Sequence, residues 1–116
     1  MSTQYGSELF SFKKSAISRL FKQANRIYKS NTVDILSDRK VFSFSRALII
    51  TPKRIGNAPK RNLLKRRVRA IFYEEKLYLL PVDLIIILKK TFPTVPFIEL
   101  KQHIISAIKP LKDTIE

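Results

Sequence analysis

The sequence predicts an α/β (α+β) two-layer sandwich in which a strongly basic helix joins two strands of a mixed sheet. Residues 82–88 (VDLIIIL) form a continuous apolar, isoleucine-rich run, which is typical of a strand covered on both faces. Residues 47–51 form a second buried strand that ends at Pro52, because proline cannot donate to a strand ladder. Between these runs, apolar residues recur at helical spacing, so the helix is expected to cross between two parallel strands.

The first third of the chain predicts a helix followed by two short strands. Residues 1–8 are polar and are expected to be flexible. Apolar residues then recur at helical spacing between basic ones, which predicts an amphipathic helix over residues 9–25. Residues 32–36 and 41–44 are expected to form or approach strands, with a turn at 38–40.

The central helix is predicted to begin near Ala58. Gly56 suits a strand-to-helix turn, Asn57 can cap the helix, and Pro59 is tolerated in a first turn, where its missing N–H breaks no ladder bond. At 100° per residue, Leu64, Val68, Ile71 and Phe72 fall on one face, which we expect to be buried. The helix is expected to end at residues 74–76.

After the strand at 82–88, Pro93 and Pro96 predict a loop, and a last amphipathic helix is expected over residues 97–111 with an interruption near Pro110. A chain of 116 residues, 45% of them hydrophobic, has the size and composition of one folded domain. We therefore expect residues 1–116 to form a single domain.

The cations are concentrated in the middle of the chain. The net charge is +14, and eleven Lys or Arg but no acid lie between Asp38 and Glu74. Like charges this close weaken a compact state, so a polyanion is the expected counterpart: nucleic acid first, an anionic membrane surface second. The candidate phosphate-binding residues are Lys53, Arg54, Lys60, Arg61, Asn62, Lys65, Arg66, Arg67 and Arg69.

Several chemistries are disfavoured by composition. The chain has no cysteine, which excludes disulfides and thiolate zinc sites. Its one histidine, His103, is expected to face solvent, and its carboxylates are too scattered for a two-metal nuclease. No metal site and no catalytic residue are therefore expected on the protein. The N-terminus lacks a secretory signal pattern and no apolar run could span a bilayer, so a cytoplasmic protein is expected.

The central block resembles the protein component of bacterial ribonuclease P. The residues 53–56 (KRIG) are similar to the KKxG element of that family. Arg61-Asn62, Lys65-Arg66 and Arg69 are similar to its RNxxKRxxR helix. The order of elements also matches over residues 9–111.

The resemblance implies a fold like ribosomal protein S5 domain 2, with a left-handed crossover. It also implies a ribonucleoprotein that removes the 5′ leader of precursor tRNA, in which a catalytic RNA holds Mg²⁺ and performs the hydrolysis. The protein, expected to be a monomer without a cofactor of its own, would bind the catalytic ribonuclease P RNA and guide the single-stranded leader of the precursor tRNA.

A leader cleft is expected between the first helix and the sheet. Aromatic side chains in such a cleft can stack on any base of the single-stranded leader. The resemblance places Ile17 and Phe21 near this cleft. Core packing is the alternative interpretation for the phenylalanines. Asp34 would repel phosphate and is expected to point elsewhere. The further cleft candidates are Phe12, Val33, Lys89 and Lys90.

Two other functions remain open from sequence. A ribosomal protein or RNA-assembly factor that binds RNA without taking part in cleavage shares the same charge argument. A membrane-surface protein that uses the basic first helix is the third interpretation, although the charge maximum lies on the central helix.

Overall fold

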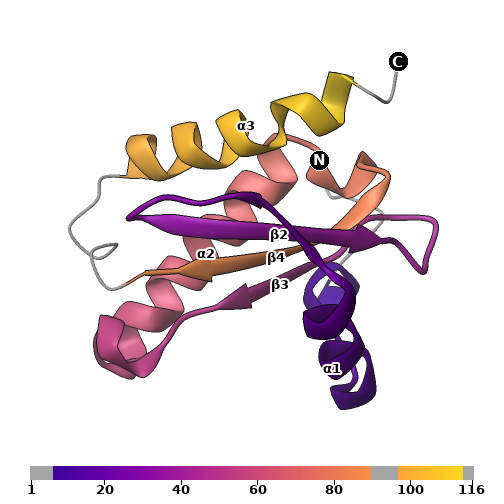
Figure 1. The fold of residues 1–116 in the computed structure, drawn as a ribbon. Coiled ribbons are helices and arrows are strands. Elements are labelled where there is room, and N and C mark those ends of the chain that lie inside the picture. The colour runs from indigo at the N-terminus through magenta and orange to yellow at the C-terminus, as the bar shows by residue number, and fades with distance from the viewer. Residues whose placement is uncertain (1–6, 90–96, 114–116) are drawn as a thin grey trace.

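The computed structural model describes residues 7–89 and 97–113, and within them a mixed four-stranded sheet packs with three α-helices (Figure 1). The strands are β1 (Asn25–Tyr28), β2 (Val33–Arg39), β3 (Ala47–Ile50) and β4 (Val82–Leu88). The helices are α1 (Lys14–Gln23), α2 (Ala58–Glu74) and α3 (Phe97–Asp113). Three short 3₁₀ helices are η1 (Ser7–Phe10), η2 (Lys53–Ile55) and η3 (Leu77–Leu79).

The sheet is organised around β4. The strand order is β1-β2-β4-β3, and β4 pairs antiparallel with β2 and parallel with β3. The predicted crossover from β3 through the basic helix α2 to β4 is therefore confirmed, as is the mixed α+β sheet. The left-handed sense of this crossover stays a prediction from the resemblance.

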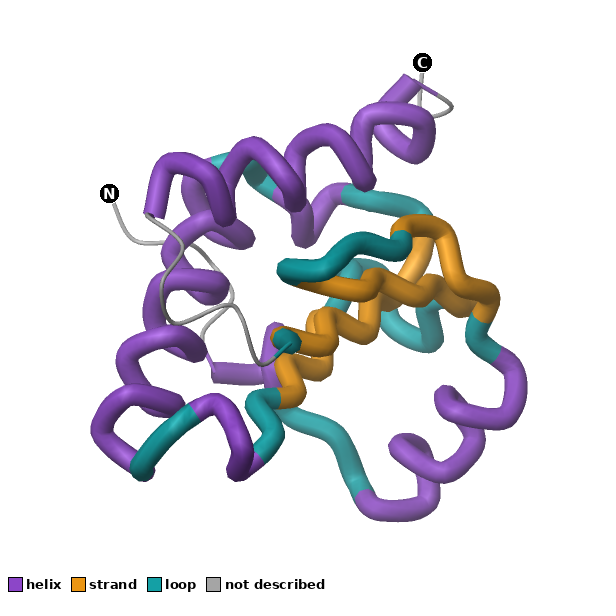
Figure 2. The backbone as a smooth tube through the Cα atoms, turned by 60° about the vertical axis from the view of Figure 1, so that its left-hand side comes forward, coloured by secondary structure: helices purple, strands orange, loops and turns teal. Residues whose placement is uncertain are grey.

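The helices cover both faces of the sheet. Figure 2 shows α2 and α3 on one side of the strands and α1 on the other. The main core lies under α2 and α3, where alternate residues of β2 and β4 meet the apolar stripes of the two helices. Its fully buried side chains from the sheet, α2 and α3 include Val33, Ile35, Leu84, Ile86, Leu88, Val68, Ile71, Phe72, Ile104 and Ile108.

The start of α2 matches the sequence prediction. The Asn57 side chain accepts a hydrogen bond from the Lys60 backbone N–H at 3.1 Å, and Pro59 lies in the first turn. Gly56 is nearly fully extended, with φ 159° and ψ −170°. The helix ends at Glu74, and Lys76 then takes a left-handed conformation with φ 54° that turns the chain toward η3.

The predicted first helix is wrong at its start. Leu9 and Phe10 belong to η1, and α1 begins only at Lys14 after an extended Lys13. Leu9 is buried in the core under α2 and α3, whereas α1 lies on the opposite face of the sheet. One continuous helix cannot reach both faces, so the chain breaks between them.

The early strands also differ from prediction. β1 was not predicted because its NRIY sequence is polar, half exposed and short, and it lies at the sheet edge. β2 runs to Arg39, through the predicted turn, since it pairs with β4 over its whole length. Residues 41–44 form bends and no strand, and the Phe42 ring instead stacks on Phe44 at 5.5 Å.

Two predictions for α3 are wrong. The helix continues through Pro110 to Asp113, although this proline cannot donate to the Ser106 carbonyl. Ser106 is exposed, so water can satisfy that carbonyl.

His103 was expected to face solvent, but it is half-buried, and its Nδ1 lies 2.7 Å from the Tyr28 hydroxyl. The loop expected around Pro93 and Pro96 lies outside the described residues.

Replacing the cap residue tests how α2 is stabilised. Asn57→Ala removes the acceptor for the Lys60 N–H and should lower the free energy of unfolding by about 1 kcal/mol. Asn62→Ala is the matched control: the same substitution at an exposed interior position raises helix propensity and should not destabilise the protein. Urea denaturation of both variants measures the difference, and equal stabilities would contradict the capping role.

Candidate nucleic-acid interface

The cations of η2 and α2 form the largest charged feature, which we call the basic face. It consists of Lys53, Arg54, Lys60, Arg61, Lys65, Arg66, Arg67 and Arg69. All eight are exposed or half-exposed. On α2, Leu64, Val68 and Ile71 form the buried stripe. Lys60 and Arg67 flank this stripe on one side, and the other helix cations extend around the helix from its other side. These are eight of the nine residues that the sequence predicted to bind phosphate, and the ninth, Asn62, is exposed on the same helix.

No member of the basic face pairs with a carboxylate among residues 7–89 and 97–113. The nearest acids along the helix, Glu74 and Glu75, are held by α3: Lys101 Nζ lies 3.4 Å from Glu74 Oε1 and 3.6 Å from Glu75 Oε2. The positive charge of the basic face is thus left for a partner to neutralise.

Two arginines of the basic face are partly enclosed by the fold. The Arg61 Nε is buried and has no hydrogen-bond partner in the described part of the chain. The Arg69 guanidinium lies 5.1 Å from the centre of the Phe10 ring, which contacts Phe72 and Tyr73 edge-on. Aromatic support of this kind limits the rotamers of Arg69, so less entropy is lost when it binds a phosphate.

Ile55 explains how Lys53 and Arg54 reach the same surface. Its side chain is buried in the core, and it fixes the η2 turn immediately before α2. The two cations that precede Ile55 are exposed. The KRIG segment is therefore an anchored turn that extends the basic face beyond the helix.

The open face of the sheet, opposite the main core, lies on the side of α1. Ile17 on α1 is half-buried and Phe21 is 48% exposed. Strand alternation directs Leu36, Leu48 and Ile87 to this face, and all three are half-buried. The structure thus gives Ile17 and Phe21 an apolar sheet surface on their side of the molecule.

Val33 is a wrong prediction for the leader cleft. Its side chain has no exposed surface and belongs to the core under α2 and α3, so it cannot contact a bound strand. The alternation of β2 places Leu36 on the open face instead. A sequence argument would have needed the register of β2 to choose between these two residues.

The expectation for Asp34 is also wrong. Asp34 shares the open face with Ile87, its ladder partner. Its charge is neutralised there: Lys89 Nζ lies 3.0 Å from Asp34 Oδ1, and Arg26 lies 3.9 Å from Oδ2. Lys89 is consequently committed to an internal ion pair, and Lys90 lies outside the described residues.

Phe12 lies apart from Ile17 and Phe21. Its ring packs 4.1 Å from the guanidinium of Arg46 and lines a cavity of about 460 Å³ between α1 and residues 41–46. Arg46 is 6% exposed, and its guanidinium lies 3.3 Å from Asp83 Oδ2. The sequence reasoning missed this pair, although an acid inside an apolar strand and an isolated arginine before another strand were its available signals.

Burial raises the pKa of the Asp83 carboxyl above its ordinary value. The hydrogen bonds and charge of Arg46 act in the opposite direction, and the neighbouring charge of Asp38 adds to the rise. Asp83 Oδ1 also accepts the Arg46 backbone N–H at 2.8 Å. The pair therefore fixes both the backbone and the side chain of Arg46 at the start of β3.

In the described ranges, no group of three or more His, Asp or Glu is placed to hold a metal ion. None of the described helices has the length and hydropathy needed to cross a bilayer.

A mixed α+β sheet that carries an unneutralised arginine-rich helix is typical of a polyanion-binding protein, with nucleic acid as the first class of partner. Comparison with known proteins identifies the family. The family model described as Ribonuclease P matches residues 12–112, and the chain belongs to this family. It is thus a protein component of ribonuclease P, the tRNA 5′-maturation enzyme, as the resemblance predicted.

Individual relatives agree with this assignment. The chain is 27% identical over 104 residues to the ribonuclease P protein component of Petrotoga mobilis, covering 85% of this chain and 87% of the relative. The RNase P protein of Thermotoga maritima superposes with a TM-score of 0.71 at 25% identity, covering 81% and 89% of the two chains. The Staphylococcus aureus RNase P protein shares the fold, with a TM-score of 0.78 at 20% identity and coverage of 87% and 93%.

Substitutions at Asp83 test the buried pair. Asp83→Ala removes both acceptors and leaves the Arg46 charge buried and unpaired, so it should lower the free energy of unfolding by about 3–5 kcal/mol. Asp83→Asn keeps one acceptor oxygen and should cost less. Asp38→Ala, in the facing ladder position, removes a charge that opposes Asp83 ionisation and should cost least.

The raised pKa of Asp83 determines how the stability of the protein depends on pH. Because the pKa of Asp83 is raised in the folded state, the folded protein holds this proton more tightly than the unfolded chain. The contribution of this bound proton to the free energy of unfolding is complete below the pKa of Asp83 in the unfolded chain. It is lost as pH rises through the pKa of Asp83 in the folded protein. The stability gap between the wild type and Asp83→Asn should shrink over that range in urea titrations, and a widening gap would contradict this account.

Proposed function

We propose that this chain is a non-catalytic subunit that docks on the catalytic RNA through the basic face and presents the open sheet face beside α1 to the leader of precursor tRNA. The observation that carries this proposal is the absence of any carboxylate partner for the eight cations of the basic face within the described residues. The roles of individual residues below belong to the same proposal.

Binding of a folded RNA follows from the charge pattern. Each phosphate neutralised by a cation releases condensed counterions, so eight clustered cations provide a large, salt-sensitive driving force. The deep major groove of A-form RNA cannot be read by side chains, so contact through phosphates and shape is the expected mode. Arg61, Arg66 and Arg69 offer planar guanidinium groups that fit phosphate oxygens two at a time.

Leader binding is assigned to the other face of the sheet. Phe21 is exposed on α1, and the apolar side chains of Leu36 and Ile87 lie on the same side of the sheet. An unpaired base can stack on such a surface irrespective of its identity. The ion pairs of Asp34 with Lys89 and Arg26 remove the repulsion that an isolated carboxylate would exert on the leader phosphates.

The residues of the basic face do not fit Mg²⁺. Guanidinium and ammonium groups repel a divalent cation, and Asn62 contributes one neutral oxygen where Mg²⁺ prefers several oxygen ligands. We therefore assign Mg²⁺ and the hydrolytic step to the catalytic RNA.

The repulsion between two copies of a chain with net charge +14 favours a protein monomer. The compartment we infer is the cytoplasm, where tRNA is made.

Reconstitution tests this division of labour. The purified protein alone should leave precursor tRNA uncut, and it should restore cleavage at low Mg²⁺ when it is added to a bacterial ribonuclease P RNA. Gel analysis of end-labelled precursor measures both reactions. Cleavage by the protein alone, failure to stimulate the RNA, or recovery of ribosomal RNA without ribonuclease P RNA in a pull-down would overturn the proposal.

The salt dependence tests the basic face. Replacing Arg61, Lys65 and Arg66 together with glutamine should flatten the slope of log K against log salt by roughly 0.7–0.9 per lost phosphate contact. The matched control replaces Lys29, Lys76 and Lys109, which are exposed on other segments, with glutamine. This control removes the same net charge and should change the slope less. Equal slopes for the two triple variants would exclude α2 from the interface.

A further inference from the structure

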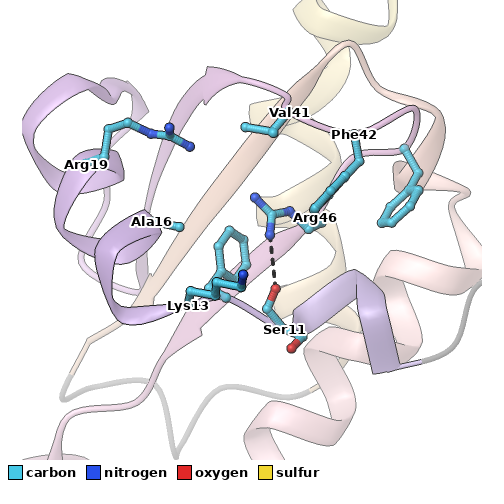
Figure 3. Close-up of a pocket in the computed structure, with 9 residues that line it drawn as sticks. Ser11, Lys13, Ala16, Arg19, Val41, Phe42 and Arg46 are labelled. Atoms are coloured by element: carbon cyan, nitrogen blue, oxygen red, sulfur yellow. Dashed lines mark hydrogen bonds between the residues drawn. The ribbon is translucent and has the colours of Figure 1, made fainter.

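A cavity lies on the flank of α1 that faces residues 41–46. This cavity has a volume of about 460 Å³ and is lined by three phenylalanine rings, two small apolar side chains and three cations. Figure 3 shows Arg19 extending toward it from α1, with Val41 and Phe42 on the opposite side. The lining residues are Ser11, Phe12, Lys13, Ala16, Arg19, Val41, Phe42, Phe44 and Arg46.

The position on α1 separates this cavity from the predicted leader cleft. Ala16 and Arg19 line the cavity, and Gln23 continues the same side of the helix. Ile17 and Phe21 lie roughly 150° away around the helix axis at 100° per residue. Leu20, between these two sides, is buried against the sheet. A strand bound beside Phe21 would therefore not occupy the cavity.

Planar groups are already held in place around the cavity. The guanidinium of Arg46 lies 4.1 Å from the centre of the Phe12 ring and 4.6 Å from that of Phe42, and the rings of Phe42 and Phe44 are nearly parallel. Arg46 cannot swing away, because it also donates to Asp83 Oδ2 at 3.3 Å and to the Ser11 carbonyl at 3.1 Å. The wall of the cavity is thus preorganised for flat ligands.

The wall also leaves apolar surface uncovered. The Phe42 ring is 49% exposed, which is a large apolar surface to leave in water.

Cations continue from the cavity along the chain. A neighbouring cavity of about 410 Å³ shares Arg19 and Val41 and adds Arg39 and Lys40, with Asp38 as its one acid. Lys40 Nζ donates to the Ser43 carbonyl at 3.3 Å, which ties the 41–44 bend but leaves the lysine charge uncompensated. Positive groups are therefore spaced along the groove on one side of the aromatic pocket, where phosphates flanking a bound base would lie.

We propose that this pair of cavities, which we call the Phe42 pocket, binds one unpaired nucleotide of single-stranded RNA. The base occupies the aromatic cavity against Phe12 and Phe42, and the flanking phosphates contact Arg19, Arg39 and Lys40. A second copy of this chain is a poor occupant, because it would bring like charges together on both sides of the contact. The cavity volume lies within the ~300–1,000 Å³ typical of ligand sites.

The proposal rests on the RNA-binding function but concerns a surface that the basic face does not include. The probe is a fluorescent, unstructured hexaribonucleotide, and the assay is anisotropy with the full chain at low salt. Phe42→Leu keeps an apolar side chain and removes the ring, so binding should weaken about 5- to 150-fold, as expected for the loss of one base–aromatic stack. Phe42→Tyr retains the ring and should bind within a few-fold of the wild type.

Matched variants separate the Phe42 pocket from other effects. Arg19→Gln should weaken binding of the hexanucleotide, whereas Ile98→Ala, at an apolar position on α3 that is at least as exposed as Phe42, should not. Thermal unfolding shows whether each variant is folded. Wild-type affinity in both Phe42→Leu and Arg19→Gln would overturn the proposal. This outcome is independent of the α2 triple variant, whose weaker binding to the catalytic RNA tests the basic face.

Cross-linking locates the bound base directly. A hexanucleotide carrying one 5-iodouridine is irradiated with the full chain, and the protein is then digested with trypsin. Lys40 and Arg46 release the peptide 41–46, whereas Phe21 lies in the separate peptide 20–22. Cross-links to 41–46 support the Phe42 pocket. Cross-links confined to 20–22, or to peptides of α2, would overturn it.

The same chemistry identifies which RNA supplies the nucleotide. Iodouridine is placed either in the leader of precursor tRNA or in single-stranded segments of the catalytic RNA, and the complete complex is irradiated. A cross-link to 41–46 from one of these RNAs supports the proposal and identifies the source. The absence of such a cross-link from both would overturn it.

Discussion

The structure depends on how α2 is held while its cations repel one another. Leu64, Val68, Ile71 and Phe72 bury one side of the helix, and burial of four such side chains contributes about 1.5–3 kcal/mol each. Repulsion between exposed charges is weaker, because water and salt screen it. The core can therefore keep the basic face together before any RNA binds, so the partner meets a formed surface and need not order a disordered segment.

The placement of the acids serves the same end. Asp83 is used inside the protein to fix Arg46, and Asp34 fixes Lys89 at the end of β4. Glu74 and Glu75 connect the end of α2 to Lys101 on α3. In each case the carboxylate holds a cation that lies outside the basic face. Positive charge is thus divided into a structural part, which is paired, and a part available to RNA.

The sequence was most informative where a local pattern determines the structure. The cap at Asn57 and the bounds of β4 depend on neighbouring residues, and they were predicted correctly. Val33 was misassigned because the face of β2 depends on its register with β4, which local spacing does not contain. Residues 41–44 alternate like a strand, but the rings of Phe42 and Phe44 stack on each other and no neighbouring strand pairs with them.

The width of α1 explains why both of its flanks are available. A helix is about 10 Å across, whereas four strands spaced about 4.8 Å apart span considerably more, so a single helix cannot cover the open face of the sheet. Leu20 anchors the middle of the helix, and apolar surface remains on either side. On one side of the helix, Phe21 stays exposed near half-buried residues of the sheet. On the other side, Phe42 stays exposed. A strand of RNA long enough to pass α1 could therefore contact aromatic groups on both flanks, with the basic face free to hold a second RNA.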